Sequence, residues 1–450
     1  MSRPTLDLAR RVRREAIDSL EAHLARFDDV QIAAELDSLD DDERELVLRS
    51  LPEERRPEVL EQMRSEAATS VIRRLAPEDA AALLDELDRD DVVDILGRLK
   101  QPALGEILSR FDTHDAAELQ ELLAYDPDSA GGRMAPETVR VPQDATVGDV
   151  VTQLQRRSEE LPQTAFNVYV VDEFQRLVGV VVLRKLVVSP ADQAVRHIMD
   201  PEVVSVSVTD DQEEVADLAS RYDLVEIPVL DSQRRLVGVV TIDDIVDVLR
   251  EEATEDILKM AGAGEMLVDT REFWSSFRVR LPWLGTAAIG GFLVAVALSG
   301  FADALRTVPA LALFMPVIAG MGGNVGMQSS TIVVRGLAVG YVEAGKVSRL
   351  LLREALLGIS FGLVYGVLIA LSAPWLGDSV DGFRLGIVLV LGMVGSMTIA
   401  ATVGASAPLL LHAANIDPAV ATGPFVTTAV DILGLLFYFA MATWLLGVAM

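Results

Sequence analysis

The 450-residue chain contains no cysteine and only four histidines. Without thiols it can form no disulfide, thiolate metal site or cysteine nucleophile. The histidines are far apart and form no HExxH motif, so a zinc hydrolase has no visible ligands. The first fifteen residues are rich in arginine and contain no apolar run, so they are not expected to be a signal peptide. The N-terminal part is therefore predicted to stay in the cytoplasm.

Positive charge is also scarce, because 39 Lys and Arg oppose 68 Asp and Glu, for a net charge of −29. This balance argues against a nucleic-acid partner, since such proteins neutralise phosphates with basic side chains. The imbalance is confined to one part of the chain. Residues 273–450 hold seven acids and eight bases, which leaves 61 acids and 31 bases in residues 1–272. An acidic front is thus fused to an almost uncharged, apolar back.

The apolar back contains five runs long enough to cross a bilayer, which takes roughly 20 residues each. They cover about 281–300, 308–334, 354–375, 384–411 and 418–448. With the front inside, six basic residues flank the inner ends and two (Arg306 and Arg384) lie outside, in agreement with the positive-inside rule. The C-terminus is then outside. Buried helices of a large soluble protein are the less favoured alternative, because five such runs would need a very large core.

The second run contains Gly320, Gly322, Gly323 and Gly326 together with the carboxamides Asn324 and Gln328. The two carboxamides are four residues apart and share one helix face. Glycines allow close helix packing, whereas polar groups at membrane depth line a wet cavity or pair with each other. Tight packing and an ion pathway therefore explain this segment equally well.

The last run contains a carboxylate, Asp431, near its centre, with Thr427 one helical turn before it. Pro424 precedes both, and Asp417 stands just before the run. An ionised carboxylate in a span is costly unless it meets water or a cation, so an ion pathway is favoured over a protonated, hydrogen-bonded aspartate. Two copies in a C2 dimer would provide carboxylate, hydroxyl and amide oxygens. Oxygen ligands suit Mg²⁺, Ca²⁺ and Mn²⁺, and a wide, wet dicarboxylate site favours hydrated Mg²⁺.

The acidic front divides into two patterns. Residues 1–130 read as short amphipathic helices with acidic joints such as Leu39-Asp-Asp-Asp-Glu, in which N-caps and acids stand at helix starts. Their approximate regularity predicts a helical superhelix. Residues 131–242 alternate strands and helices, and Val170-Val171-Asp172 returns 59 residues later as Val229-Leu230-Asp231.

The repeated segment resembles a pair of cystathionine-beta-synthase-type (CBS) domains, which are regulatory modules that often bind adenosine nucleotides. In the second copy, Thr241 and Asp244 match the family residues that hold a ribose. The first copy has Val182 and Lys185 at the equivalent places. A nucleotide-binding pair and a purely structural, metal-sensing pair both remain open.

Residues 243–270 connect this pair to the membrane part. The segment up to Met260 is predicted as one acidic helix with an apolar stripe of Ile245, Leu249, Ile257 and Met260. Its acids Asp247, Glu251 and Glu255 lie one turn apart and repel each other unless a cation joins them. A solvated helix face is the alternative to a role in coupling the two halves.

In order, these parts resemble the MgtE family of magnesium channels over nearly the whole chain. The most specific matches are Gly322-Gly323-Asn324-Val-Gly326-Met-Gln328 and the series from Asp417 to Asp431. The resemblance implies a homodimer in the plasma (inner) membrane, with Asp431 as the central ion-binding carboxylate. It also implies cytosolic Mg²⁺ sites, which match this chain at Asp91, Asp94, Glu213, Asp223, Asp247, Glu255 and Asp256. Family members can bind ATP at the CBS pair, and the run here is Arg184-Lys185.

The sequence therefore predicts a multidomain membrane protein with an α-helical N-domain, α/β CBS domains and a five-helix membrane domain in residues 271–450. Its predicted function is a Mg²⁺-selective channel for magnesium uptake that cytosolic Mg²⁺ closes, and not an enzyme. Two other functions remain open. One is an ion-coupled transporter or exporter of Mg²⁺ or another divalent cation. The other is a membrane-anchored sensor of metal or nucleotide that conducts nothing.

Overall fold

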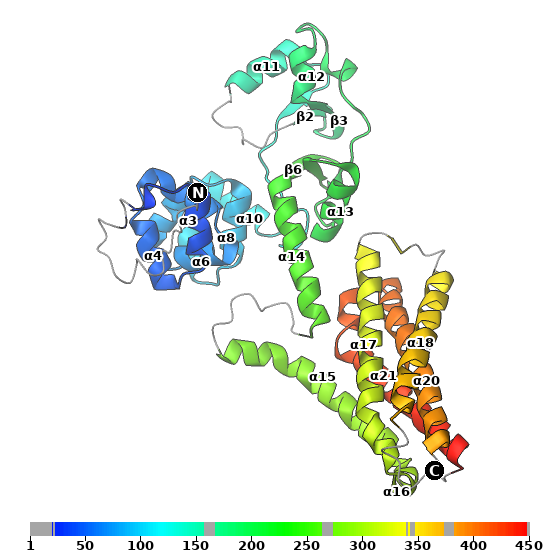
Figure 1. Ribbon diagram of the computed structural model, residues 1–450. Helices are drawn as coiled ribbons and strands as arrows, with labels where there is room; N and C mark the ends of the chain where they lie inside the picture. Colours follow the sequence, from blue (N-terminus) through cyan, green and yellow to red (C-terminus); the bar gives the residue numbers. More distant parts are fainter. Residues whose placement is uncertain are drawn as a thin grey trace. The chain divides into compact units, whose positions relative to one another are not determined.

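The computed structural model describes residues 20, 23–156, 167–262, 273–338, 341–342, 347–372 and 382–447 (Figure 1). The chain forms two compact units, Met1–Arg250 and Glu251–Met450, and each is described by itself. Several sequence-based expectations lie outside the described residues: the Arg-rich N-terminus, the connecting segment after Gly262, and residues 373–375 and 448 of two predicted spans.

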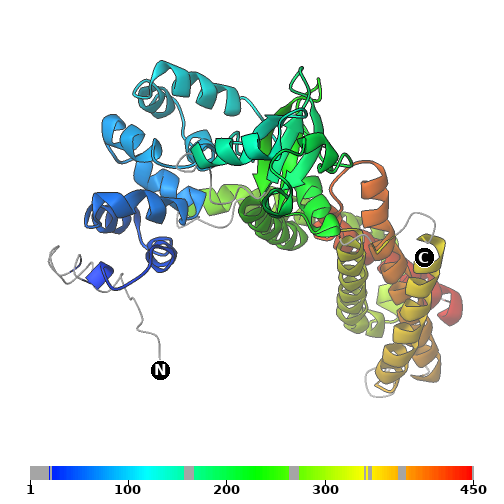
Figure 2. The same cartoon turned by 90° about the horizontal axis from the view of Figure 1, so that it is seen from above.

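The first part of the N-terminal unit is all α-helical, as predicted. Helices α3, α5, α7 and α9 pack in series, and so do α4, α6, α8 and α10, so each helix contacts the one two further along the chain. This alternation builds a superhelical stack, whose members run from dark blue to cyan in Figure 2. The helices are α3 (Asp29–Leu36), α4 (Asp41–Arg49), α5 (Arg56–Glu61), α6 (Ser65–Ile72), α7 (Pro77–Leu84), α8 (Arg89–Gly97), α9 (Ala103–Leu108) and α10 (Thr113–Leu122).

Acidic residues start several of these helices, as the sequence predicts. Asp28 caps α3, and Asp40 forms a capping box with Glu43 at the start of α4. Asp88 occupies the N-cap position of α8 but makes no capping hydrogen bond. Its side chain lines a pocket instead, so the acid at this joint does not serve as a helix cap.

Two copies of a small α/β fold follow. Strand β2 (Asn167–Val171) corresponds to β5 (Glu226–Leu230), 59 residues later. In each copy the central strand pairs antiparallel with the next strand and parallel with the preceding one, which gives the sheet orders β1-β2-β3 and β4-β5-β6. The remaining elements are β1 (Arg140–Pro142), α11 (Val147–Arg156), β3 (Leu177–Val182), α12 (Leu183–Val188), β4 (Val206–Ser207), α13 (Gln212–Tyr222) and β6 (Leu236–Thr241). The predicted repeat is confirmed.

The acidic helix α14 (Ile242–Met260) begins directly after β6. Ile245 and Val248 are buried in a hydrophobic core that they share with apolar residues of the helical stack and of the second α/β copy. Leu249 and Ile257 are 46% and 62% exposed, so the predicted apolar stripe is buried only at its start.

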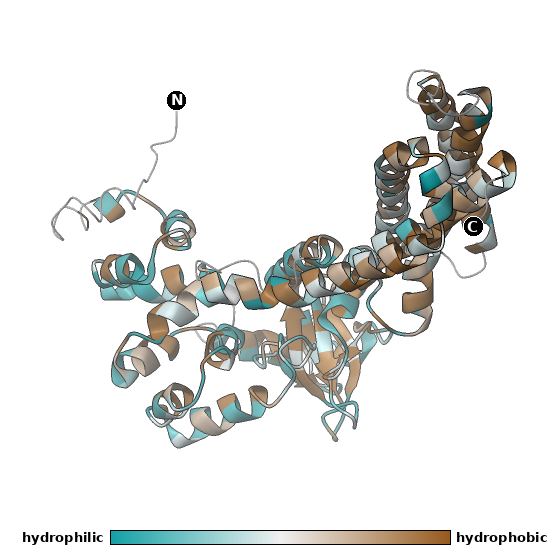
Figure 3. Ribbon diagram, turned by 90° about the horizontal axis from the view of Figure 1, so that it is seen from below, coloured by the Kyte–Doolittle hydropathy of each residue, from teal (hydrophilic) through white to brown (hydrophobic). Residues whose placement is uncertain are grey.

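The C-terminal unit has five helices that are long and apolar enough to span a membrane, among the residues that the structure describes. They are α15 (Phe273–Ser299), α17 (Ala310–Ala338), α18 (Val347–Ala370), α20 (Gly382–Ala413) and α21 (Pro424–Leu446), with the short α16 (Ala302–Thr307) between the first two. Apolar residues extend along these helices (Figure 3). Helix α20 is central and packs against α17, α18 and α21.

Several predicted span boundaries differ from the structure. The first long helix, α15, starts at Phe273 instead of residue 281. Helix α18 starts at Val347 instead of residue 354, because Arg349 and Arg353 end a hydropathy window without ending a helix. The last span starts at Pro424 instead of residue 418. Residues Pro418–Ala421 form a separate 3-10 turn, and Pro424 at the first turn of α21 suits a helix start because its missing N–H needs no partner there.

Candidate ion pathway and acidic pocket

The glycine-rich segment of helix α17 has two different faces. Gly322 and Gly326 are buried, and a Cβ atom added to Gly326 would lie 3.0 Å from a methyl group of Val430 in α21. Asn324 and Gln328 are exposed, and a Cβ atom added to the adjacent Gly323 would meet nothing within 4 Å. One set of glycines therefore allows close packing, while the carboxamides lie on the open side of the same helix.

Asp431 lies in the middle of α21, directly after the buried Val430 that packs on α17. Its side chain is half-buried, and among the described residues it has no hydrogen-bond or ion-pair partner. The Thr427 hydroxyl donates to a carbonyl of its own helix, Pro424 O, at 3.2 Å, so its oxygen still has a free lone pair. The predicted set of polar residues thus lies on two helices in direct contact, α17 and α21.

A cluster of charged side chains lies where the last turn of α14 meets the turn before α21. Lys259 forms ion pairs with Glu255 of its own helix and with Asp417, whose Oδ2 lies 2.7 Å from Lys259 Nζ. Asp417 also caps the turn before α21 by accepting a hydrogen bond from the Ala419 N–H at 2.7 Å. Burial, with repulsion from Asp417 and Glu252, raises the pKa of Asp256 to about 6. Three predicted metal ligands, Glu255, Asp256 and Asp417, therefore lie together.

An acidic pocket of about 500 Å³, including its open part, lies within the N-terminal unit. It joins the helical stack to the second α/β copy and the start of α14. The acids that line it are Glu61, Asp88, Asp90, Asp91, Glu137, Glu226, Asp243 and Asp244.

Three aspartates of this pocket have pKa values well above the ordinary one. Burial, reinforced by Asp244, raises the pKa of Asp91 to about 8. Burial and Asp243 raise that of Asp244 to about 7, although the Thr241 hydroxyl donates to Asp244 Oδ2 at 2.9 Å and favours the anion. The pKa of Asp90 is also raised well above its ordinary value, chiefly by burial. Without a cation, the pocket keeps protons that exposed acids would release.

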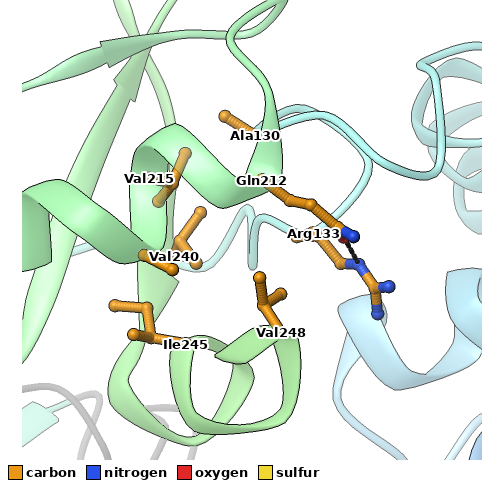
Figure 4. A pocket seen from close by; sticks show the side chains of 8 residues that line it. Ala130, Arg133, Gln212, Val215, Val240, Ile245 and Val248 are labelled. Carbon is orange, nitrogen blue, oxygen red and sulfur yellow. Dashed lines mark hydrogen bonds between the residues drawn. The ribbon is translucent and has the colours of Figure 1, made fainter. Parts of the chain in front are cut away.

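Asp94, one turn after Asp91, has a different environment. Asp94 Oδ2 lies 3.0 Å from Arg133 Nη1, and Arg133 Nε donates to Gln212 Oε1 at 2.9 Å. Figure 4 shows this Arg133–Gln212 bond beside the buried Val248 of α14. Burial raises the pKa of Asp94 more than Arg133 lowers it. Arg133 thereby connects α8, the junction after the helical stack and α13.

Some predicted site residues are not brought together. Glu213 and Asp223 are exposed at opposite ends of α13, so they cannot share one ion. Asp247 is exposed and pairs with Arg250 at 3.2 Å. Within the described ranges, no three Asp, Glu or His side chains converge tightly enough to hold a bare metal ion.

The predicted nucleotide residues are also separated. Thr241 and Asp244 belong to the acidic pocket of the second copy, whereas Arg184 is exposed on α12 of the first.

Sequence reasoning missed several members of these clusters. Glu61, Asp90 and Glu137 were indistinguishable from other acids in a chain with 68 of them. Lys259 was the more visible signal, because it is the single base in the acidic run from Glu251 to Met260. A lysine one turn after Glu255 favours an ion pair with it, and this signal could have identified the contact.

Three family models match the chain. The model described as "MgtE intracellular N domain" matches residues 27–128, the CBS domain model matches 131–191 and 195–251, and the MgtE "Divalent cation transporter" model matches 315–441.

Curated relatives match most of the chain. The magnesium transporter MgtE of Bacillus subtilis is 40% identical over 338 residues, which are 74% of this chain and 73% of the relative. That of Thermus thermophilus is 38% identical over 337 residues, 74% of each. A crystal structure of the cytosolic domain of the Mg²⁺ channel MgtE in complex with ATP is 34% identical, with a TM-score of 0.50, and covers 54% of this chain and 100% of that one.

Proposed function

Because the chain belongs to the MgtE family of magnesium transporters, we propose that Mg²⁺ crosses the membrane beside Asp431 and that cytosolic Mg²⁺ closes this pathway. The protein is a magnesium channel and not an enzyme, and it is a multi-pass membrane protein whose N-terminal domains are cytosolic. We further infer four functional parts: the helical domain (1–130), the CBS pair (131–242), the connecting segment with the acidic helix (243–270) and the membrane domain (271–450).

The observation that carries the pathway is the polar face in an otherwise apolar bundle. Asn324 and Gln328 are exposed on α17, and Asp431 on the adjoining α21 lacks a hydrogen-bond partner among the described residues. Polar groups at membrane depth persist where they line a water-filled cavity or meet a partner. Carboxylate, carboxamide and hydroxyl oxygens are hard ligands, and Mg²⁺ keeps several of its waters, so these residues can bind it without direct contact from each one.

We propose a homodimer with the pathway on its two-fold axis and the C-terminus outside the inner membrane. A single chain provides one central carboxylate, and a C2 pair provides two, which matches the charge of one Mg²⁺. The exposed side of α17 is then the surface that a second copy and the pathway share.

Closure is proposed to depend on the two acidic clusters of the soluble part. In the N-terminal unit, Asp91 and Asp244 face one pocket from different domains, so a hydrated Mg²⁺ between them would replace repulsion with attraction. At the end of α14, Glu255 and Asp256 lie beside Asp417 before the last span. Cytosolic Mg²⁺ shifts the channel toward its closed form because it binds that form more tightly. Asp94, Glu213, Asp223 and Asp247 remain weaker candidates, because the structure separates them or gives them protein partners.

ATP is proposed to bind at the first CBS copy, with Arg184 facing its phosphates. The support is the ATP complex of the related cytosolic domain. Thr241 and Asp244 fit a triphosphate poorly, since the pocket around them is lined by carboxylates. Titration calorimetry with ATP should therefore show binding that Arg184→Ala weakens and Asp244→Asn does not.

The test of the pathway is Mg²⁺ flux in liposomes with Mg²⁺ varied separately on each side. Asp431→Asn keeps the shape of the side chain and should abolish flux, whereas exposed Asp303→Asn, outside the polar face, serves as the control. Undiminished flux in Asp431→Asn would refute the pathway. A stoichiometric need for Na⁺ or H⁺ would instead indicate a coupled transporter. Closure that survives deletion of residues 1–130 would refute the sensing role.

A further inference from the structure

Glu354, near the start of α18, is a charged side chain that the pathway does not explain. It is only 6% exposed although it belongs to an apolar span. A buried carboxylate is costly in such a place unless it has a partner, and intramembrane acids usually have functional roles.

The partner of Glu354 is Ser329 of α17. The Ser329 hydroxyl donates to Glu354 Oε2 at 2.7 Å, and both side chains are buried. Ser329 directly follows Gln328 and lies five residues after Asn324, so this hydrogen bond fixes α17 close to both predicted pathway residues.

Helix α18, which holds Glu354, packs closely against α20. Its buried residues, Glu354, Gly358, Gly362 and Gly366, follow each other every four positions on one face. A Cβ atom added to Gly358 would lie 2.7 Å from Met397 O, and one added to Gly362 would lie 2.8 Å from Met393 O. Helix α18 therefore lies directly against the backbone of α20, and Glu354 is the member of this face that reaches α17.

The orientation of α17 matters because its other buried face contacts α21. Gly322 and Gly326 lie against Val430, the residue before Asp431. A rotation of α17 would therefore move Asn324 and Gln328 relative to Asp431.

We propose that Glu354 is a positioning residue, which through Ser329 fixes the α17 carboxamides relative to Asp431. This inference rests on the proposed pathway. Glu354 acts as a hydrogen-bond acceptor in this role, so its geometry matters and its charge does not.

The experiment compares Mg²⁺ flux and single-channel conductance in reconstituted full-length variants. Ser329→Ala and Glu354→Ala should each lower conductance about fivefold, the change that corresponds to the ~1 kcal/mol of one hydrogen bond. The double variant should lose no more than either single variant, because both remove the same bond. Glu354→Gln should restore most of the conductance, since its amide oxygen accepts from Ser329. Ser360→Ala is the matched control, because the Ser360 hydroxyl donates to a carbonyl of its own helix, Leu356 O at 2.8 Å, and not to another described helix.

Three results would overturn the inference. A loss of conductance in Glu354→Gln equal to that in Glu354→Ala would show that the charge of Glu354 matters. Additive losses in the double variant would show that the two residues act separately. Lower melting temperatures with unchanged conductance would show a structural role only, and Ser329→Ala keeps this readout available if Glu354→Ala does not fold. Asp431→Asn in the same assay tests the pathway itself, so loss there with unchanged Ser329→Ala and Glu354→Ala would reject only the positioning role.

Discussion

Raising the pH from 6 to 7 without divalent cations should destabilise the N-terminal unit. The reason is Asp91, whose pKa rises from the ordinary 3.8 to about 8 because it is buried beside Asp244. Between these two values the folded form holds a proton that the unfolded chain has released. The destabilising contribution of Asp91 is therefore absent in acid and grows as the pH rises from 3.8 toward 8.

The size of the effect follows from this proton. A group that is protonated in the folded chain and ionised in the unfolded chain lowers the free energy of unfolding by about 1.4 kcal/mol per pH unit. Asp244, with a pKa of about 7, adds a smaller contribution of the same sign. For a unit of this size, the contribution of Asp91 alone corresponds to a fall in Tm of about 3–6 °C between pH 6 and 7.

The assay is thermal unfolding of residues 1–262, followed by circular dichroism in EDTA at pH 6, 7 and 8. A related cytosolic domain crystallised without its membrane part, which supports the use of this fragment. Saturating Mg²⁺ should raise Tm most at pH 8, because fewer protons then compete with the cation for the carboxylates of the pocket. Asp91→Asn should raise the Tm measured in EDTA at pH 8, make this Tm less dependent on pH and reduce the stabilisation by Mg²⁺.

Asp112→Asn provides the control for this experiment. Hydrogen bonds from the backbone N–H groups of Asp115 and His114 hold the pKa of Asp112 below its ordinary value. Its contribution is present above that ordinary value and is lost only in acid, so its substitution should change Tm equally at pH 6, 7 and 8. A Tm in EDTA that is constant or rises from pH 6 to 7, or an unchanged slope in Asp91→Asn, would refute the reasoning.

Three further predictions concern single contacts. Lys259→Gln removes the cation that joins α14 to Asp417 before the last span. If this ion pair favours the closed form, patch recordings should show a higher open probability at low cytosolic Mg²⁺, and an unchanged or lower one would refute that role. Arg133→Met removes the ion-pair partner of the half-buried Asp94 and should lower the free energy of unfolding by about 2 kcal/mol in urea titrations, whereas less than about 1 kcal/mol would show that the pair matters little. Gly362→Val should prevent folding or lower Tm sharply in detergent, because its side chain would collide with the backbone of α20; a wild-type Tm would contradict this packing.

The sequence by itself determined the parts of this protein and their order. Hydropathy depends on local composition, so the five spans were found, with errors where charged turns remain helical, as at the start of α18. The repeat at Val170 and Val229 identified the CBS pair, because a duplicated pattern needs no knowledge of contacts. Asp431 could also be identified without knowledge of contacts, because a carboxylate within an apolar run stands out from its neighbours in the sequence.

Only the tertiary structure decided which polar groups meet. Asp91 and Asp244 face one pocket although different domains provide them, and Arg133 pairs with Asp94, which had been considered a metal ligand. It also showed that Gly322 packs on a neighbouring helix while Gly323 lies open. Residue type and periodicity describe what a helix face can do, but its neighbour depends on how distant segments pack, and burial and pairing of charges follow from that packing.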